Sequence, residues 1–207
     1  MATIRNSSPT KQKAQRERKR QDEVLEASAK LFHEKGYSDT TVQDVADALG
    51  MLKGSLYYYI DTKEDLLFNL LVQVHDEVDE LLEEVKAMPG LTPLQRLEIY
   101  VRRLTSYNLY NLDRATVYYH DVDRLSEDRR SVIMARRKSE NQFVARLIRQ
   151  AQQDGDADDS MDAIILTNFV FSTMIWTYRW YRPQGFDAEM VADLCSKFAI
   201  GGITGFP

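Results

Sequence analysis

The sequence predicts an all-α protein, and three features point to that fold class. The 207-residue chain has only 9 glycines and 5 prolines, about half the average usage, whereas sandwiches and barrels need many tight turns. Its apolar residues recur at intervals of three and four, as they do on one face of a helix. Residues that favour helix N-termini precede several of these segments. Apolar residues make up 43% of the chain, so we expect a buried core rather than general disorder.

The first part of the chain is expected to hold an arm and four helices. Residues 1–17 are polar and lack periodicity, so we expect them to form a flexible basic arm. Thr41 and Thr62 are the expected N-caps of the second and fourth helices, each with an aspartate three residues later. Gly36 and Gly50 are expected to end the first two. The expected helices span residues 18–35, 42–49, 52–59 and 63–87.

The rest of the chain predicts five further helices separated by short breaks. Proline is favoured at the first position of a helix, so Thr92 and Pro93 mark the start of the fifth. The later breaks contain Gly, Pro or Asp. The expected helices span residues 93–111, 113–124, 126–153, 160–181 and 187–200, the last of them ended by Gly201 and Gly202.

Charge is unevenly distributed along the chain. The net charge is −5, but residues 1–63 carry +2 and the remaining 144 residues carry −7. A basic end on an acidic body predicts that one part binds a polyanion and the other does not. A solvated, disordered tail is the alternative explanation of the basic run. That run contains Arg5, Lys11, Lys13, Arg16, Arg18, Lys19 and Arg20.

Composition excludes several classes of protein. The single cysteine, Cys195, cannot form an intramolecular disulfide and does not suit a cysteine-based zinc site. No apolar run approaches the roughly 20 residues of a membrane span, and the basic N-terminus lacks the apolar core of a signal peptide. We therefore expect a cytoplasmic protein that binds no membrane, no cofactor and no metal.

Two short helices joined by a tight turn, after a longer first helix, form a helix-turn-helix arrangement. Their apolar faces close a small core, while the third helix turns a polar face outward. Lysine reaches guanine acceptors or phosphates, glycine allows close backbone approach, and serine and tyrosine hydroxyls donate to phosphates. The pattern predicts DNA binding, and a three-helix module with an incidental polar face is the alternative. The outward residues are Lys53, Gly54, Ser55, Tyr57 and Tyr58.

Residues 23–67 resemble the N-terminal domain of the TetR family of bacterial transcriptional regulators. The family usually has His and then Phe at two positions where this chain has Tyr59 and Ile60, a departure that concerns the details of DNA contact. The likeness is carried by residues 29–37 (AKLFHEKGY), 40–46 (TTVQDVA), 53–60 (KGSLYYYI) and 62–67 (TKEDLL).

The resemblance implies an assembly and a role for each residue of the motif. It implies a dimer whose recognition helices enter successive major grooves, about 34–36 Å apart. It implies that Lys53, Gly54 and Tyr58 face the bases. The implied phosphate contacts are Thr41, Ser55, Tyr57, Tyr59 and Lys63. The expected organisation is a basic arm over 1–17, a DNA-binding domain over 18–66, and an effector-binding and dimerisation domain over 67–207.

The helix expected over 160–181 is apolar on nearly every face, and such a helix is expected to be buried on every face. In a body of this size, that requires one face on the core and another on a partner. The resemblance implies the same, because the family dimerises through its last two helices in a four-helix bundle. A central helix in the core of a monomer is the alternative.

Aromatic residues, mostly tyrosines, concentrate on successive helices of the body. A tyrosine combines an apolar ring with a hydroxyl that needs a partner, so a cluster of them suits a ligand pocket with a few polar anchors. Packing in the core is the alternative for each of them. The candidate ligand-binding residues are Tyr107, Tyr110, Tyr118, Phe143, Trp176 and Arg179.

Residues 178–183, Gly185 and the ending 201–204 resemble a narrower branch of the family, which contains regulators that sense acyl-CoA thioesters of fatty-acid and sterol breakdown. This resemblance implies a long, partly apolar pocket with cationic anchors, and Arg179 is a candidate because arginine binds phosphate through two parallel hydrogen bonds. Arginines of the preceding long helix are further candidates, or form a solvated face. They are Arg129, Arg130, Arg136, Arg137, Arg146 and Arg149.

The sequence thus predicts a homodimeric repressor that binds a near-palindromic DNA operator and is released by a small apolar effector, with an acyl-CoA thioester as the leading candidate. A regulator of another hydrophobic or aromatic ligand, a metal-sensing regulator and an all-α enzyme are the alternatives. The enzyme alternative has no nucleophile or phosphate-binding motif to support it. Its three histidines, His33, His75 and His120, are far apart in the sequence.

Overall fold

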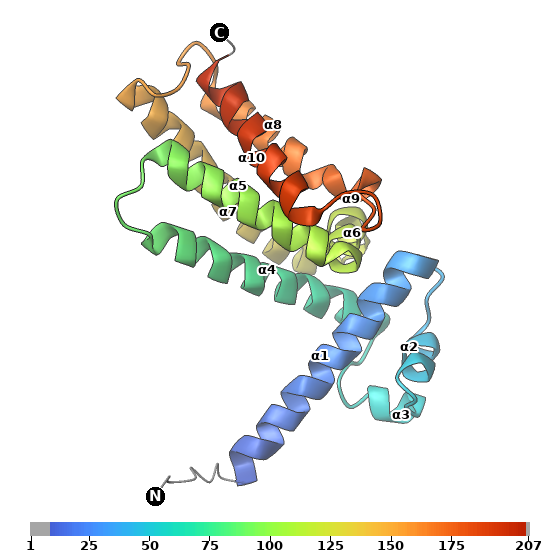
Figure 1. Ribbon diagram of the computed structural model, residues 1–207. Helices are drawn as coiled ribbons and strands as arrows, with labels where there is room; N and C mark the ends of the chain where they lie inside the picture. The colour runs from blue at the N-terminus through green and yellow to red at the C-terminus, as the bar shows by residue number, and fades with distance from the viewer. Residues whose placement is uncertain (1–8, 206–207) are drawn as a thin grey trace, which may run out of the picture. The chain divides into compact units, whose positions relative to one another are not determined.

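The computed structural model describes residues 9–205, and every regular element among them is a helix. The predicted all-α fold class is therefore confirmed. The chain divides into two compact units, of which the first ends at Leu70 and the second begins at Leu71, so the division falls inside α4. The helices are α1 (Pro9–Lys35), α2 (Val42–Ala48), α3 (Lys53–Leu56), α4 (Lys63–Ala87), α5 (Pro93–Tyr110), α6 (Leu112–Asp121), a short 3₁₀ helix (Val122–Arg124), α7 (Glu127–Asp154), α8 (Ala163–Ile175), α9 (Thr177–Trp180) and α10 (Ala188–Thr204) (Figure 1).

The N-terminal unit is a small core closed by α1, α2, α3 and the start of α4. Each of these helices contributes apolar side chains that are fully or almost fully buried, so the three-helix arrangement predicted from the apolar faces is present. The most buried of them are Val24, Ala29, Phe32, Val45, Ala46, Leu56, Leu66, Leu67 and Leu70.

The helices α2 and α4 begin at the N-caps that the sequence predicted. The Thr41 hydroxyl accepts from the Asp44 amide at 3.1 Å, and the Asp44 carboxylate accepts from the Thr41 amide at 2.6 Å. Thr62 and Asp65 make the same exchange at 3.2 and 2.6 Å. Each exchange satisfies amides that have no partner within the helix. Hydrogen bonds from the Thr41 and Lys35 side chains also hold the pKa of Asp44 well below its ordinary value.

The N-terminal helix is longer than the sequence analysis expected. A flexible arm over 1–17 is wrong for residues 9–17, because α1 begins at Pro9 rather than near Arg18; residues 1–8 lie outside the described part of the chain. Proline suits the first turn of a helix, and the lysines, arginines, glutamine and alanine that follow favour its interior. An ion pair one turn apart, between Lys13 and Glu17 at 3.9 Å, adds to this preference.

The recognition helix is shorter than the expected span of 52–59. α3 ends at Leu56, and the three tyrosines that follow form a tight turn. The amides of Tyr58 and Tyr59 bond to carbonyls only three residues earlier, at 3.3 and 2.9 Å. A run of bulky aromatic residues lowers helix propensity and favours this tighter path.

The helix expected over 160–181 is in fact two. α8 begins at Ala163, where the Asp162 carboxylate caps it by accepting from the amides of Ile164 and Ile165 at 2.7 and 3.2 Å. A break at Trp176 then separates α8 from α9. No helix among the described residues combines the length and apolar character needed to cross a lipid bilayer.

The last helix also runs further than expected. Gly201 and Gly202 were expected to end it, but both are helical within α10. The helix ends instead at Gly205, whose φ of 85° lies in the region that favours glycine.

Within the C-terminal unit, α5 packs along α10 and α7, and α8 packs against α7 and α10 (Figure 1). Their shared core is apolar except for a few hydroxyl and amide groups. Its most buried large side chains are Leu97, Tyr100, Val101, Val117, Ile133, Ile148, Met174 and Ile203.

A side chain from α5 caps the C-terminal end of α4. The Arg96 guanidinium donates to the carbonyl of Val85, to that of Lys86 at 3.0 Å and to that of Met88 at 2.8 Å. The last carbonyls of a helix lack partners within it, and the cation opposes the negative end of the helix dipole. Arg96 therefore fixes the point at which α4 stops.

Candidate DNA-binding face and effector pocket

The helix α3 separates one buried side chain from a row of exposed polar ones. Leu56 is fully buried against the core, whereas the residues on the other sides of the helix and in the turn after it are exposed. Burial of Leu56 therefore fixes which face α3 turns to solvent. The exposed residues are Lys53, Gly54, Ser55, Tyr57 and Tyr58, which are five of the eight residues predicted to contact DNA.

Neighbouring side chains order this exposed face. The Lys53 ammonium lies 5.9 Å from the centre of the Tyr57 ring, and the rings of Tyr58 and Tyr59 meet edge to face at 5.2 Å. Tyr59 is partly buried, while Thr41 at the head of α2 is exposed. The hydroxyl and ammonium groups of this face are of the kinds that bind phosphate and base edges.

The structure gives Lys63 a contact that the sequence analysis did not anticipate. Its ammonium donates to the carbonyls of Tyr37 and Ser38, at 2.8 and 3.2 Å, and lies 4.3 Å from the centre of the Tyr37 ring. Lys63 thus ties the first turn of α4 to the turn that follows α1. Its predicted phosphate contact stays a prediction.

The sequence analysis assigned no role to Leu52, which occupies the N-cap position of α3. Its side chain is 80% exposed and makes no capping hydrogen bond. Leucine is disfavoured at an N-cap, where Ser, Thr, Asp or Asn would satisfy a free amide. The sequence did show an apolar residue directly before Lys53, where a polar capping residue is usual.

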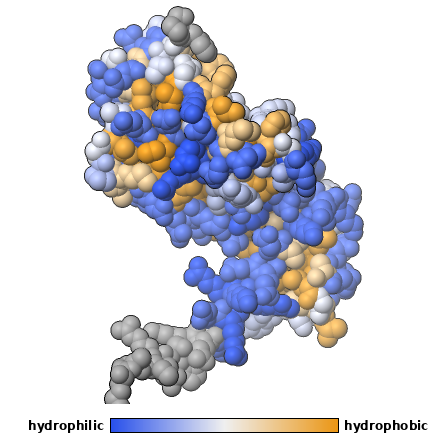
Figure 2. Space-filling model, in the orientation of Figure 1, coloured by the Kyte–Doolittle hydropathy of each residue, from blue (hydrophilic) through white to orange (hydrophobic). Residues whose placement is uncertain are grey.

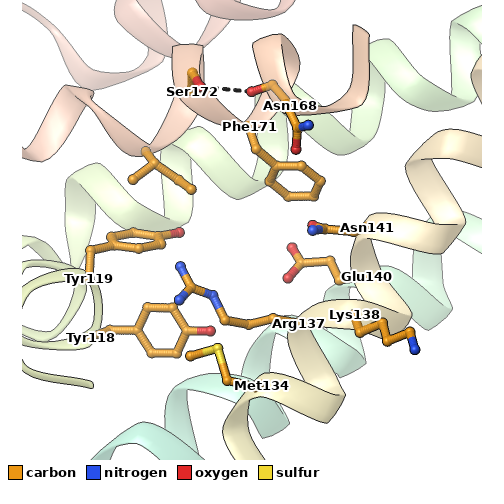
Figure 3. A pocket seen from close by; sticks show the side chains of 11 residues that line it. Tyr118, Tyr119, Met134, Arg137, Lys138, Glu140, Asn141, Asn168, Phe171 and Ser172 are labelled. Carbon is orange, nitrogen blue, oxygen red and sulfur yellow. Dashed lines mark hydrogen bonds between the residues drawn. The ribbon is translucent and has the colours of Figure 1, made fainter. Parts of the chain in front are cut away.

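A pocket of about 440 Å³ lies between α6, α7 and α8 in the C-terminal unit (Figure 3). One part of its lining is aromatic and aliphatic, and the other is polar, a combination typical of small-molecule sites. The residues that line it are Tyr118, Tyr119, Met134, Arg137, Lys138, Glu140, Asn141, Asn168, Phe171, Ser172 and Ile175.

Two buried polar contacts support the wall of this pocket. The Tyr118 hydroxyl and the His75 Nε2 atom lie 2.8 Å apart, and burial, helped by the Arg136 cation, lowers the pKa of His75 to about 4. The Tyr100 hydroxyl donates to the Glu140 carboxylate, and burial raises the pKa of that carboxyl above its ordinary value. The wall is therefore held by groups from α4 and α5 as well as by its own helices.

The structure brings one of the six predicted ligand-binding residues to this pocket, Tyr118. Phe143 lies in the core, edge to face with the Tyr100 ring at 5.7 Å. Tyr107 donates to Glu77 at 2.7 Å. Three others lie at the surface and do not line the pocket: Tyr110, Trp176 and Arg179, whose guanidinium lies 5.6 Å from the Trp176 ring. Their ligand contacts stay predictions.

Tyr119, a member of the aromatic cluster from which the candidates were chosen, also lines the pocket. Three lining residues carry polar chemistry that the sequence analysis did not assign to a site: Glu140, Asn141 and Asn168. Arg137 was named only as one of six arginines on a long helix. These residues come from α7 and α8, and no local pattern joins all of them. The sequence could have placed only Arg137 and Glu140 together, since residues three apart share one face of a helix.

An exposed apolar face covers α8 and α10. Phe169 is 63% exposed, Leu194 57% and Phe198 66%. Figure 2 shows apolar side chains gathered among polar ones on the C-terminal unit. The described face also includes Ile164, Ile165, Trp176, Phe186 and Met190. Contiguous exposed apolar surface of this kind marks interaction sites.

Comparison with family models finds a match for each part of the chain. Residues 24–70 match the model described as bacterial regulatory proteins, tetR family. Residues 90–203 match the model described as tetracyclin repressor-like, C-terminal domain. The second match alone covers more than half of the chain.

Comparison with characterised proteins and solved structures agrees with these models. The chain is 30% identical to the HTH-type transcriptional repressor KstR2 of Mycobacterium tuberculosis, over 89% of this chain and 93% of that protein. The structure of the M. tuberculosis ketosteroid transcriptional regulator KstR2 is similar with a TM-score of 0.84 at 29% identity, covering 90% and 96% of the two chains. AibR, solved with isovaleryl coenzyme A and operator DNA, is similar with a TM-score of 0.79 at 27% identity, covering 86% and 97%.

Proposed function

Because this chain belongs to the TetR family of bacterial transcriptional regulators, and is a repressor rather than an enzyme, we propose that it binds a near-palindromic operator as a homodimer. A small apolar effector, an acyl-CoA thioester, releases it from that operator. Residues 18–66 form the DNA-binding domain in this proposal, and residues 67–207 bind the effector and a second copy of the chain.

The single observation that carries the proposal is the two-sided character of α3. Leu56 anchors the helix in the core while Lys53, Ser55, Tyr57 and Tyr58 are exposed. Their donors suit phosphates and guanine acceptors in a major groove. The bases are read by Lys53, Gly54 and Tyr58, and the phosphates are held by Thr41, Ser55, Tyr57, Tyr59 and Lys63.

The exposed apolar face of α8 and α10 supports the homodimer. A second copy related by a two-fold axis would present the same face, so one surface serves both partners. Phe169, Leu194 and Phe198 would then leave water, which is the driving force for association. Dimerisation also accounts for the palindromic operator, because two equivalent recognition helices read two equivalent half-sites.

The pocket between α6, α7 and α8 supports an effector site, and the surface cluster of Trp176 and Arg179 supports a second contact area for a long ligand. The acyl part of a thioester would occupy the pocket, whose lining is partly aromatic and aliphatic. The phosphates of coenzyme A would pair with Arg179 and other exposed arginines. AibR, a relative in fold, is known with an acyl-CoA bound, which places this ligand class first among the candidates.

Effector and DNA influence one another through a coupling free energy between two sites. We propose that α4, which contains the boundary between the two units, transmits this coupling. Effector binding would favour a state in which the two recognition helices no longer match the half-site spacing.

Fluorescence anisotropy tests the proposal with DNA that flanks the gene of this protein, at fixed salt, with free CoA and with a panel of acyl-CoA thioesters. We expect tight binding to one DNA site and release by one class of thioester but not by free CoA. A Lys53→Ala variant should weaken binding, whereas Lys30→Ala, on an exposed position of α1, should change it little. Tight binding indifferent to every thioester would remove the acyl-CoA assignment and keep the repressor. Failure to select any DNA site from a genomic library would contradict the operator assignment.

A further inference from the structure

The most informative side chain in the pocket is Arg137, which is partly buried and has no hydrogen-bonded partner among the described residues. Its guanidinium lies 5.2 Å from the centre of the Tyr118 ring and 5.7 Å from that of Tyr119 (Figure 3). The ring faces attract the cation but accept none of its five N–H donors in the plane of the guanidinium. Its N–H donors therefore remain available to an acceptor on a ligand.

The neighbouring arginine makes the contrast clear. Arg136, one position earlier on α7, pairs with Asp76 at 2.6 Å and with Asp79 at 2.5 Å. The same helix therefore satisfies one arginine with two carboxylates of α4 and leaves the next one directed into the pocket. Arg137 is the one that a ligand can reach.

Several groups around Arg137 offer hydrogen-bond donors to the pocket. The side chains of Asn141 and Asn168 face the pocket and make no hydrogen bond to described residues (Figure 3). The Tyr119 hydroxyl accepts from Asn108 at 3.3 Å and keeps its own proton to donate. The one carboxyl group of the lining, that of Glu140, already accepts from Tyr100.

We infer that this pocket binds the carboxylate of an apolar ligand, with the carboxylate oxygens on Arg137 and the hydrocarbon part against Phe171, Ile175 and Met134. A planar guanidinium and a carboxylate form two parallel hydrogen bonds, which a hydrocarbon chain cannot offer. The inference deepens the proposed function, on which it rests by taking this pocket as the effector site. For an acyl-CoA effector, this means that the acyl group carries a free carboxylate at the end opposite the thioester.

Glu140 lies on the same wall of the pocket as Arg137. Burial raises the pKa of its carboxyl, while the hydrogen bond from Tyr100 and the Arg137 cation act in the opposite direction. A purely structural role for Arg137, as a cation that orients the Tyr118 ring, is the competing explanation, and it predicts no preference among ligands.

Two pairs of probes, each matched in hydrocarbon length, test the inference by isothermal titration calorimetry on the full chain without DNA. Adipoyl-CoA is compared with hexanoyl-CoA, and octanoate with 1-octanol. We expect the carboxylate member to bind at least about ten-fold more tightly than its partner in one pair or both. Arg137→Met should abolish this preference. Lys30→Met removes a positive charge from an exposed position of α1, does not alter the pocket lining, and should keep the preference.

The outcomes separate this inference from the proposed function. A preference below about two-fold, equal preference in Arg137→Met, or no binding by any carboxylate probe overturns the inference. Circular dichroism of Arg137→Met checks that its fold is intact, and Arg137→Lys, which keeps the charge but not the planar fork, should restore part of the preference if the first variant is unstable. Operator binding by the unliganded protein tests the proposed function on its own, because it does not involve the pocket.

Discussion

Arg114 on α6 donates two parallel hydrogen bonds to the Glu77 carboxylate on α4. The Nη1 atom donates to Oε2 at 3.0 Å and the Nη2 atom to Oε1 at 2.8 Å. The Tyr107 hydroxyl of α5 donates to the same Oε2 atom at 2.7 Å. One carboxylate of α4 thus fastens two other helices, and its planar geometry specifies their orientation.

Removal of Arg114 alone is expected to destabilise the protein. An Arg114→Leu variant leaves the Glu77 carboxylate without its cation, and we expect a loss of about 2–3 kcal/mol in the free energy of unfolding. This is less than the 3–5 typical of a fully buried pair, because the Glu77 side chain is 34% exposed. Urea titration measures it. The double variant Arg114→Leu with Glu77→Leu should recover most of the loss; if it is as unstable as the single variant, the ion pair is not the cause.

Stability should decrease in acid because His75 is buried in its neutral form. The unfolded chain binds a proton at this residue below about pH 6.5, whereas the folded chain does so only below about pH 4. The unfolded state therefore binds more protons in this interval. The contribution is full above pH 6.5 and is lost as the pH falls towards 4, up to about 3 kcal/mol. The groups that face the ring are Tyr118 on α6, Arg136 and Arg137 on α7, and Asp76 and Asp79 on α4.

A His75→Gln variant isolates this effect from the titration of carboxylates. Its amide still offers a partner to the Tyr118 hydroxyl but does not titrate. Thermal unfolding at several values between pH 4 and 7 should show a smaller decrease in the variant than in the natural protein. Parallel curves for the two proteins would argue against His75 as the source.

Leu52 is expected to reduce stability and to increase DNA affinity. A Leu52→Ser variant gains a capping hydroxyl at the start of α3, and its free energy of unfolding should rise by about 1 kcal/mol. The same change removes an exposed apolar side chain that suits the methyl group of thymine in a major groove. We expect its operator affinity to fall several-fold in anisotropy measurements.

The variant Leu52→Ala separates the two effects, since alanine removes the side chain without adding a cap. It should lose the same affinity with no gain in stability. Replacement of single thymines by uracil in the operator removes the methyl group and should weaken the natural protein at one position of each half-site. If the thymine-to-uracil change at that position weakens operator binding by Leu52→Ala as much as by the natural protein, Leu52 does not contact the methyl group.

A charge in the middle of the apolar face of α8 and α10 should prevent the dimerisation that we propose. Phe198→Glu alters a side chain that is 66% exposed, so the monomer should fold normally. We expect its dimer dissociation constant in sedimentation equilibrium to rise by at least about ten-fold, because a buried unpaired carboxylate is costly. Val132→Glu places the same charge on an exposed position of α7 and should leave the dimer dissociation constant unchanged. If Phe198→Glu and Val132→Glu have the same dimer dissociation constant, the interface lies elsewhere.

Local signals in the sequence predicted most of the helices. Thr41 with Asp44, and Thr62 with Asp65, act within four residues of one another, so their effect is visible without tertiary structure. The end of α10 was not predictable in this way, since Gly202 has helical backbone angles and only the backbone of Gly205 departs from them.

The pocket depended on contacts that the sequence does not display. Tyr118 was selected from an aromatic cluster, but its partner His75 lies 43 residues away on another helix. Arg137 lines the pocket without a hydrogen-bond acceptor from the described residues around it, and only the packing of α6, α7 and α8 reveals this. The position of Trp176 at the surface, at the junction of α8 and α9, was likewise not visible in the apolar pattern, which predicted a buried helix.

The contact of Arg96 with the end of α4 identifies a point at which the chain can be lengthened. Because a side chain of α5 holds the carbonyls of Val85, Lys86 and Met88, the connection over residues 89–92 is not required to stop that helix. Gly90 in this connection is exposed, and beyond its chain neighbours no atom lies near the position of an added side chain. A fluorescent protein inserted after Pro89 would leave both helix ends anchored and would mark the folded regulator in a living cell.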